Sequence, residues 1–248
     1  MTRNKTGLAL PVLYLDENVV VVNKPSGLLV HRSGIDRGAT EFALQTVRDQ
    51  LGQHVYPVHR LDRATSGALV MALDVESARR LSEQFAAALV EKTYKAVVRG
   101  TPQPRFTVDH PLKEELDRMT DRMAQKDKPA QTAVTDFATL AQIEFPDRVD
   151  KFPTSRYSLV QARPKTGRKH QIRRHSAHVG HPIVGDVTHG SGKHNRFFRQ
   201  RFGLHRLLLA CVELSFAHPL SGKRLNVPAP LADDFSELLR TLGWSAHA

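Results

Sequence analysis

Residues 59–67 read His59-Arg60-Leu61-Asp62-Arg63-Ala64-Thr65-Ser66-Gly67 and lead directly into the apolar run Ala68–Leu73. The run is typical of a buried β-strand, and the residues before it are typical of a turn at the mouth of that strand. The turn holds one carboxylate, Asp62, between two arginines, whose positive charge favours the ionised form. Catalytic groups are common on such loops. Asp62 is therefore a candidate catalytic residue; the alternative is that it only caps the turn by accepting backbone N–H groups.

The hydrophobic pattern on both sides of this stretch predicts a mixture of strands and helices. Strands are expected at residues 19–22, 28–30, 68–73, 92–99, 133–140, 156–162 and 207–216. Helices are expected at residues 40–51, after Asp74, from Arg168 to about Val179, and at residues 233–242. Residues 101–130 are predicted to form a long surface connection, and residues 145–152 and 191–203 polar loops. Strands outnumber helices and often look paired as hairpins, which predicts an α+β fold with a mostly antiparallel mixed sheet flanked by helices and loops.

The domain organisation predicted from the sequence is a short tail, residues 1–12, followed by one contiguous catalytic domain, residues 13–245, because no obvious linker interrupts the 248 residues. No apolar run approaches the ~18 residues of a membrane span. The N-terminus has no apolar core or cleavage site of a secretory signal. The one cysteine, Cys211, excludes an internal disulfide framework and a cysteine-based zinc site. A cytoplasmic protein is the simplest interpretation.

The positive charge is concentrated in one part of the chain. Residues 1–150 hold 20 Lys and Arg against 20 Asp and Glu, so the whole net charge of +11 lies in residues 151–248. Residues 151–211 hold 13 basic residues, seven histidines and a single acid, Asp186. Such a density predicts a surface that faces a polyanion, most often a nucleic acid. The alternatives are a solvated basic face without a partner and a membrane surface, which the absence of a strong amphipathic helix disfavours.

Two further segments carry candidate residues. Residues 164–175 form the basic string Pro-Lys-Thr-Gly-Arg-Lys-His-Gln-Ile-Arg-Arg-His, in which Lys165, Arg168, Lys169, His170 and Arg174 are candidates for contact with RNA phosphates. Tyr94 lies on the alternating segment Glu91–Ala96 and would by default be a core or interface residue.

Other chemistries find little support in the sequence. The histidines at 170, 175, 178 and 181 lack an accompanying HExxH string or convergent carboxylates, so no metal site is predicted. Neither a GxxxxGK[ST] nor a GxGxxG loop occurs, which leaves a nucleotide cofactor unsupported. Ser66 lacks the GxSxG context of a serine hydrolase.

Taken together, three motifs resemble those of the RluA-type pseudouridine synthases: HRLDxxTSG at residues 59–67, a tyrosine motif at 91–96, and TGRxHQIR at 166–173. Ala64 departs from the pattern, because an acidic residue is common there. The resemblance implies the pseudouridine synthase catalytic fold, with Asp62 as the catalytic aspartate. It implies that Tyr94 stacks on the target uracil near the C5 proton, and that Arg173 pairs with the catalytic aspartate. Arg60 would enter the space left by the flipped base. His59 and Arg63, close to Arg60 in the sequence, would contact the RNA.

The reaction implied is the isomerisation of uridine to pseudouridine in RNA, which needs no redox change and no cofactor. Whether Asp62 attacks C1′ or removes the 2′ proton stays open. Because the N-terminus is short, we expect no S4-like RNA-binding domain, and we expect the catalytic domain and its basic part, residues 151–211, to capture the RNA.

The chain most resembles family members that modify tRNA, which implies uridine 65 in the T stem as the target. The protein is expected to act as a monomer. Ribosomal RNA is the alternative substrate. From other classes, the alternatives are a non-catalytic basic RNA-binding module and a hydrolase in which Asp62 is the nucleophile.

Overall fold

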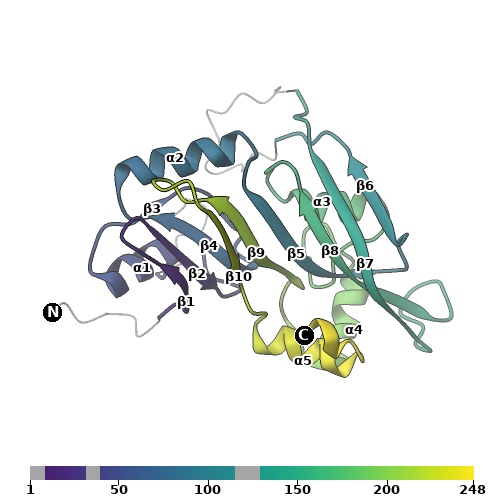
Figure 1. Ribbon diagram of the computed structural model, residues 1–248. Coiled ribbons are helices and arrows are strands. Elements are labelled where there is room, and N and C mark those ends of the chain that lie inside the picture. Colours follow the sequence, from purple (N-terminus) through teal and green to yellow (C-terminus); the bar gives the residue numbers. More distant parts are fainter. Residues whose placement is uncertain (1–8, 32–39, 115–128) are drawn as a thin grey trace. The chain divides into compact units, whose positions relative to one another are not determined.

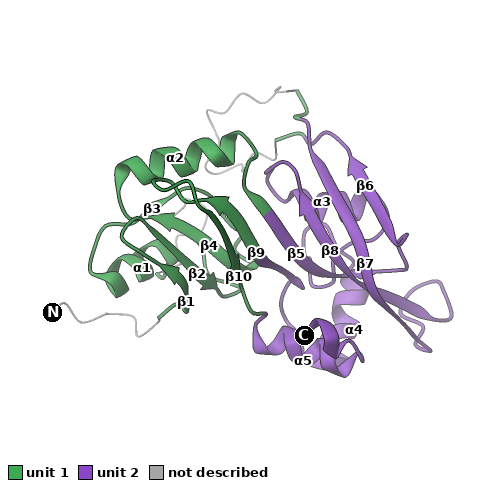
Figure 2. Cartoon of the chain, in the orientation of Figure 1, with its two compact units in different colours: residues 1–91, 113–131, 213–230 green, residues 92–112, 132–212, 231–248 purple. Residues whose placement is uncertain are grey.

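The computed structural model describes residues 9–31, 40–114 and 129–248 (Figure 1). The first eight residues of the predicted tail and residues 115–128 of the predicted connection lie outside the described residues. The chain divides into two compact units (Figure 2). Unit 1 comprises Met1–Glu91, Lys113–Gln131 and Glu213–Pro230; unit 2 comprises Lys92–Leu112, Thr132–Val212 and Leu231–Ala248. The single catalytic domain stays a prediction.

Unit 1 is built on antiparallel strands. Its strands are β1 (Val12–Leu15), β2 (Val19–Lys24), β3 (Tyr56–Pro57), β4 (Ser66–Ala72), the second half of β9 (Leu209–Ala217) and β10 (Arg224–Pro228). Strand β2 lies between β1 and β4, β3 pairs with the end of β4, and β10 pairs with β9. All seven residues of β4 are buried. The strand that follows the Asp62 turn is therefore a rigid central support for that turn.

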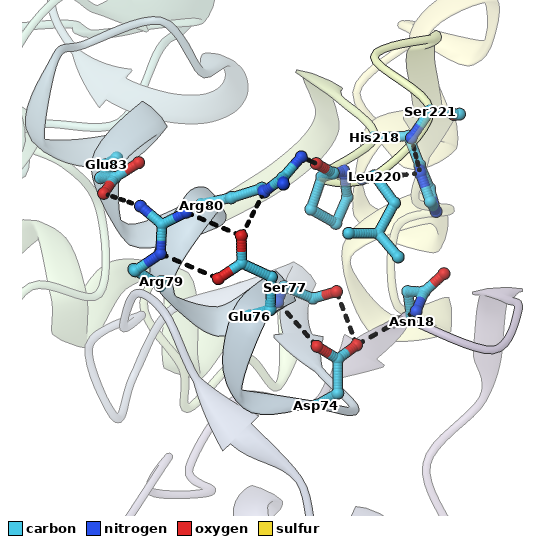
Figure 3. A network of polar contacts seen from close by, with 11 residues as sticks. Asn18, Asp74, Glu76, Ser77, Arg79, Arg80, Glu83, His218, Leu220 and Ser221 are labelled. Carbon is cyan, nitrogen blue, oxygen red and sulfur yellow. Dashed lines mark hydrogen bonds and ion pairs between the residues drawn. The ribbon is translucent and has the colours of Figure 1, made fainter.

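The helices of unit 1 are α1 (Ala43–Leu51) and α2 (Val75–Ala86). Helix α1 ends at Gly52, whose left-handed backbone (φ 67°) is the predicted glycine stop. Helix α2 begins at the predicted cap Asp74, which accepts hydrogen bonds from Ser77 N at 2.8 Å and from Asn18 Nδ2 at 3.1 Å (Figure 3). Partial burial alone would raise the pKa of the Asp74 carboxyl, but the hydrogen bonds outweigh this effect and lower the pKa below its ordinary value. The cap thus connects α2 to the turn between β1 and β2.

The exposed face of α2 carries ion pairs. Glu76 accepts from Arg79 and Arg80 on the next turn (Figure 3). Arg80 also donates to Pro219 O at 3.0 Å in the turn between β9 and β10. His218 Nδ1 accepts from Ser221 N at 3.1 Å within that turn. Exposed ion pairs each contribute roughly 0–1 kcal/mol, and the contact that reaches the β9–β10 turn is the hydrogen bond from Arg80 to Pro219 O.

Unit 2 contains a second antiparallel arrangement. Its strands are β5 (Glu91–Arg99), β6 (Arg105–Asp109), β7 (Val134–Phe145), β8 (Ser155–Pro164) and the first half of β9. They lie in the order β9–β5–β8–β7–β6. Its helices are α3 (Gln171–His178), α4 (Gly192–Phe202), α5 (Asp233–Thr241) and the 3₁₀ turn η1 (Ser245–His247).

The core of unit 2 is rich in aromatic side chains. Tyr157 is fully buried and packs edge-on against Phe198 of α4, with ring centroids 4.7 Å apart. Phe235 of α5 and Trp244 belong to the same cluster. Aromatic pairs of this kind add to the burial of apolar surface. The cluster fixes α4 and α5 on the strands of unit 2 (Figure 1).

The predicted α+β class with a mostly antiparallel mixed sheet is confirmed. None of the helices in the described ranges is long and apolar enough to cross a membrane.

Four local predictions are wrong. Residues 191–203 form helix α4 rather than a polar loop, because Phe198, Phe197 and Phe202 place a narrow apolar stripe on an otherwise basic segment. Helix α3 begins at Gln171 and not at Arg168, since His170 has a left-handed backbone (φ 55°) that cannot continue a helix. Residues 28–30 form only a single bridge, from Leu29 to Phe42. The predicted connection also contains a strand, β6.

Candidate active site

The turn that carries Asp62 is closed by its own backbone. Thr65 N donates to Asp62 O at 3.0 Å, which makes a four-residue turn directly before β4. The Asp62 side chain is half-buried, while Arg60 and Arg63 on either side of it are exposed. The structure therefore brings together the carboxylate and the arginines that the sequence singled out, on one turn of unit 1.

A buried lysine stabilises the Asp62 turn through hydrogen bonds to backbone carbonyl groups. Lys24, at the end of β2, has no exposed surface, and its ammonium donates to Pro25 O at 2.9 Å, Leu28 O at 2.7 Å and Arg63 O at 3.2 Å. A buried ammonium is tolerated only when its donors are satisfied. Because the acceptors lie on two different loops, Lys24 joins the turn at residues 24–28 to the Asp62 turn.

Further bonds between the same two loops reinforce the connection. Ser26 Oγ donates to Ala64 O at 2.7 Å, and Gly27 N donates to Arg63 O at 2.8 Å. Arg63 Nε donates in return to Gly27 O at 3.0 Å. The positive φ of Gly27 (90°) is a backbone conformation that glycine adopts readily. The Asp62 turn is thus a braced turn rather than a mobile loop.

His59 also supports the turn. Its Nε2 accepts a hydrogen bond from Val70 N of β4 at 3.0 Å, and its ring stacks on Phe85 of α2 with centroids 4.5 Å apart. The ring therefore connects the start of the turn to both β4 and α2. Contact of His59 with RNA stays a prediction.

Tyr94 and Arg173, the other predicted catalytic residues, lie in unit 2. Tyr94 is on β5, where it pairs with Ala162 of β8, and 9% of it is exposed. Arg173 is on α3 and is also buried. The predicted pairing of Arg173 with Asp62 of unit 1 stays a prediction.

Within unit 2, Arg173 forms a two-pronged ion pair with Asp186. Its Nε and Nη2 donate to the two carboxylate oxygens at 2.7 and 2.8 Å, and the side chains are 7% and 0% exposed. Burial alone would raise the pKa of Asp186, but the guanidinium and the backbone N–H groups of Thr188 and His189 lower it below its ordinary value. The pair fixes the guanidinium in one orientation.

The loop that carries Asp186 is itself tightly packed. Asn195 of α4 accepts from Gly185 N and donates to Asp186 O, both at 2.8 Å. A Cβ at Gly185 would lie 1.9 Å from Arg206 O, and one at Gly190 would lie 2.2 Å from Asp186 O. Glycine is therefore required at both positions by close backbone contact.

A cavity of about 280 Å³ opens beside Asp186. Arg196 and Arg199 of α4 line it together with Arg206 and His205. The ion pairs among the described residues do not involve Arg196 or Arg199, which are exposed. Their charges can therefore face a polyanion beside the Arg173–Asp186 pair.

Gln171 organises the basic turn before α3. It is buried, and its Oε1 accepts from Thr166 Oγ1 at 2.7 Å and from Arg168 N at 3.0 Å. Its Nε2 donates to Val134 O and Thr135 Oγ1 of β7. All of its strong hydrogen-bonding positions are used, so it fixes the turn rather than contacting a substrate.

The predicted phosphate contacts are distributed around this turn. Lys165 and Arg168 are exposed; Lys165 pairs with Asp136 at 3.2 Å, and Arg168 Nε donates to Thr132 O at 3.2 Å. Lys169 is exposed, whereas His170 and Arg174 are half-buried. His170 Nδ1 lies 3.0 Å from His189 Nε2. No group of three or more His, Cys, Asp or Glu side chains within residues 9–31, 40–114 and 129–248 could hold a metal ion.

With this geometry in place, comparison with known proteins decides the family. Residues 18–178 match the family described as RNA pseudouridylate synthase, a range that includes the turn of Asp62, Tyr94 and Arg173. The chain belongs to the RNA pseudouridylate synthase family. The resemblance to RluA-type pseudouridine synthases and the enzyme class are confirmed.

Relatives in this family match over nearly the whole chain. A protein of Vibrio cholerae named tRNA pseudouridine synthase C is 52% identical over 235 residues, covering 95% of this chain and 96% of its own. A protein of the same name from Yersinia pestis is 50% identical over 239 residues, covering 96% and 93%.

Solved structures share the fold. Human RNA Pseudouridylate Synthase Domain Containing 4 superposes with a TM-score of 0.70 at 24% identity, covering 94% of this chain and 93% of its own. Human RNA Pseudouridylate Synthase Domain Containing 1 superposes with a TM-score of 0.69 at 24% identity, covering 98% of this chain and 98% of its own. The chain therefore has the pseudouridine synthase fold.

Sequence reasoning missed the residues that support the pseudouridine synthase motifs. Lys24 could have been noticed as a lysine two residues after the β-branched run at residues 19–22. Asp186 is the one acid in a strongly basic segment, which was itself a signal for a buried partner of an arginine. Gln171 and Asn195 carry no comparable signal, because their roles depend on which backbone groups the fold brings near them.

We expect Lys24→Met to lower the free energy of unfolding by roughly 1 to 3 kcal/mol, because carbonyl groups on two loops lose a buried donor. Turnover should fall as well, since the Asp62 turn loses its brace. Urea titration and a pseudouridine assay measure the two effects. Lys223→Met, at an exposed lysine of unit 1, should change the stability by less than ~0.5 kcal/mol. Equal effects of the two substitutions would refute the brace.

Asp186→Asn should lower the stability by about 3 kcal/mol at pH 7, because it leaves the Arg173 charge buried without its anion. The pKa of Asp186 is lowered in the folded protein, so its contribution is present above its ordinary value of 3.8 and is lost as the pH falls through the lower folded value. The stability difference from wild type should therefore shrink below about pH 4. Asp147→Asn, which removes an exposed pair with Arg201, is the control and should cost no more than ~1 kcal/mol. A difference that persists unchanged to pH 2 would contradict this assignment.

Proposed function

We propose that this pseudouridine synthase converts a uridine of tRNA to pseudouridine. The observation that carries the proposal is the identity of about half of all residues, over 95% of the chain, to proteins named tRNA pseudouridine synthase C. The site residues agree with this proposal, because the carboxylate, the tyrosine and the arginine of the family motifs are all present in the matched region.

The reaction breaks the N1–C1′ bond of uridine, turns the base and joins C5 to C1′; the C5 proton moves to a nitrogen, so atoms and electrons balance within the substrate. We assign the first step to Asp62, either by attack on C1′ or by removal of the 2′ proton. Its place on a braced turn at the mouth of β4 supports this role, since a catalytic carboxylate must be held in a fixed geometry.

Tyr94 and Arg173 complete the proposed site. A flipped base is commonly held by stacking on an aromatic side chain, and Tyr94 on the rigid strand β5 would supply that surface. Arg173 would orient the Asp62 carboxylate, and Asp186 in turn orients Arg173. The exposed Arg60 would enter the space left by the flipped base, offsetting part of the few kcal/mol that flipping costs.

The proposed target is uridine 65 in the T stem. Capture of the RNA would rest on the basic part, residues 151–211, in which Arg196 and Arg199 of α4 line the cavity beside Asp186. The roles of His59 and Arg63 at the active-site turn, and of Lys165, Arg168, Lys169, His170 and Arg174 around α3, are proposed RNA contacts. We further propose that one chain acts as a monomer, in the cytoplasm, within a single catalytic domain and without a nucleotide cofactor.

Asp62→Asn should abolish formation of pseudouridine while changing the Kd for tRNA by less than about twofold, because it keeps the shape but removes the reactive charge. Unmodified tRNA and, separately, ribosomal RNA are incubated with the enzyme, and new pseudouridines are mapped by carbodiimide-blocked primer extension. A single stop in the T stem of tRNA that depends on Asp62 is expected. Asp49→Asn, at an exposed acid of α1, should retain full activity.

The other outcomes of that assay are equally decisive. A stop only in ribosomal RNA would keep the enzyme and replace the substrate. Release of free uracil would indicate hydrolysis. The absence of any product, with tight binding of RNA, would indicate a non-catalytic binding module.

Arg168→Ala and Lys169→Ala should each weaken binding of tRNA and reduce the slope of log K against log salt concentration by about 1, because each removes one phosphate contact. The rate at saturating tRNA should change little. Arg105→Ala on β6 is the control for the loss of one exposed charge. If all three substitutions give the same small effect, the turn before α3 is not a contact site.

A further inference from the structure

Unit 2 contains a second cavity, of about 240 Å³, that none of the family motifs lines. Its walls come from the end of β5, from the loop between β7 and β8 together with the start of β8, from the residues after α3, and from the first turn of α4. The side chains that matter for its chemistry are Arg99, Asp150, Phe152, Arg156, His181 and His194.

The walls are held by backbone hydrogen bonds. Gly100 N donates to Arg156 O at 2.7 Å, and Arg99 N donates to Pro182 O at 3.0 Å. His181 Nδ1 lies 2.9 Å from Arg99 O. A Cβ on Gly100 would lie 2.9 Å from the His181 ring, so glycine permits this close approach. The cavity is therefore a formed feature of unit 2.

His194 presents a hydrogen-bonding group that the protein leaves unsatisfied. The residue is 5% exposed, and its Nδ1 lies 2.7 Å from the Tyr157 hydroxyl. Its Nε2 is buried and has no hydrogen-bond partner among the described residues. Burial, followed by the nearby Arg99, lowers the pKa of His194 to about 4, so the ring is neutral at pH 7. When the Tyr157 hydroxyl donates to Nδ1, the ring proton is on Nε2, which becomes a buried donor.

The charge around the cavity favours an anion. Asp150 is the one carboxylate of its wall, and it is paired with Lys193 at 2.6 Å and lies 3.9 Å from Arg99. Arg156 is exposed, and it forms no ion pair within the part of the chain that the structure describes. A guanidinium in this setting matches the geometry of a phosphate.

Phe152 adds an aromatic surface at the same place. It is 49% exposed and is the one aromatic residue among the large apolar side chains exposed in the described part of the chain, and Lys151 Nζ lies 5.0 Å from its ring centroid. Its loop is held by Ser155, whose Oγ donates to Asp147 O at 2.8 Å and accepts from Val149 N. An exposed aromatic ring beside a basic cavity is the combination that binds the base and the phosphate of a single-stranded nucleotide.

We propose that this cavity binds one nucleotide unit, with its phosphate against Arg156, Arg99 and the Nε2–H of His194 and its base stacked on Phe152. The ligand that the cavity recognises is a nucleoside monophosphate unit, and this unit is an unpaired residue of the RNA substrate. This assignment rests on the proposed function, because it requires that the chain bind RNA. None of the residues that line the cavity belongs to the family motifs, and the cavity supplies affinity rather than chemistry.

The test measures the Kd of the full chain for tRNA at several salt concentrations. Phe152→Ala should raise the Kd roughly 10-fold without changing the salt slope, because stacking carries no charge. Phe152→Trp should retain the wild-type Kd. Arg156→Ala should raise the Kd and reduce the salt slope by about 1. Arg105→Ala is again the control, and its Kd should stay within about twofold of wild type.

A second measurement identifies the source of the nucleotide. Adenosine 5′-monophosphate and inorganic phosphate are titrated into the protein while the ring resonances of His194 are followed by NMR. Saturable shifts with the mononucleotide, lost in Arg156→Ala, support the site. If these shifts occur while Phe152→Ala leaves the Kd for tRNA unchanged, the cavity binds a free nucleotide and not a residue of the RNA substrate.

The proposal is overturned if Phe152→Ala binds tRNA like wild type and the mononucleotide leaves His194 unaffected. It is also overturned if Arg156→Ala and Arg105→Ala weaken tRNA binding equally, Phe152→Ala has no effect and the mononucleotide gives no saturable shift of His194, because the surface is then only diffusely basic. Failure of the proposed function looks different. Wild type would then form no pseudouridine in tRNA, while the losses of affinity in the Phe152 and Arg156 variants would remain.

Discussion

Arg173 and Asp186 form an ion pair that is buried in unit 2, and the contacts around it stabilise the two buried charges. A buried charge without a partner is very costly, whereas a two-pronged pair with further backbone donors is stable and keeps one geometry. Two glycines give the Asp186 loop room to pack against backbone, and Asn195 of α4 bonds the loop from the other side. The result is a guanidinium whose orientation is fixed before any substrate arrives, which is the state that an active-site arginine requires.

Unit 1 also contains a buried charge, the ammonium of Lys24. The ammonium of Lys24 is fully buried, and the carbonyl groups that accept its protons belong to two loops that would otherwise be independent. Satisfying the charge therefore forces the loops together, and one of them carries Asp62. In both units a charge that is costly to bury becomes a positional constraint on a residue of the family motifs.

Helix α4 gives the basic region of unit 2 its form. Its apolar side chains enter the aromatic core, while its polar side chains reach two separate cavities: Asn195 and Arg196 beside Asp186, and His194 beside Phe152. A helix that is anchored on one face and basic on the others can present charges at fixed positions. The basic side chains of α4 therefore have defined positions, which is what the proposed contact with RNA requires.

By itself, the sequence determined the enzyme class, the α+β architecture and the central strands and helices, because these depend on local periodicity and on short strings with chemical meaning. Asp62, Tyr94 and Arg173 could be named for the same reason. Only the tertiary structure decided that Lys24 braces the Asp62 turn, that Asp186 pairs with Arg173 and that Gln171 fixes the turn before α3. It also decided that residues 191–203 are a helix and that His194 and Phe152 share a cavity. Burial and hydrogen-bond partners arise from residues distant in the chain, whereas a one-dimensional pattern records only neighbours. The left-handed backbone of His170, which delays the start of α3, is the clearest case: no helical periodicity could reveal it.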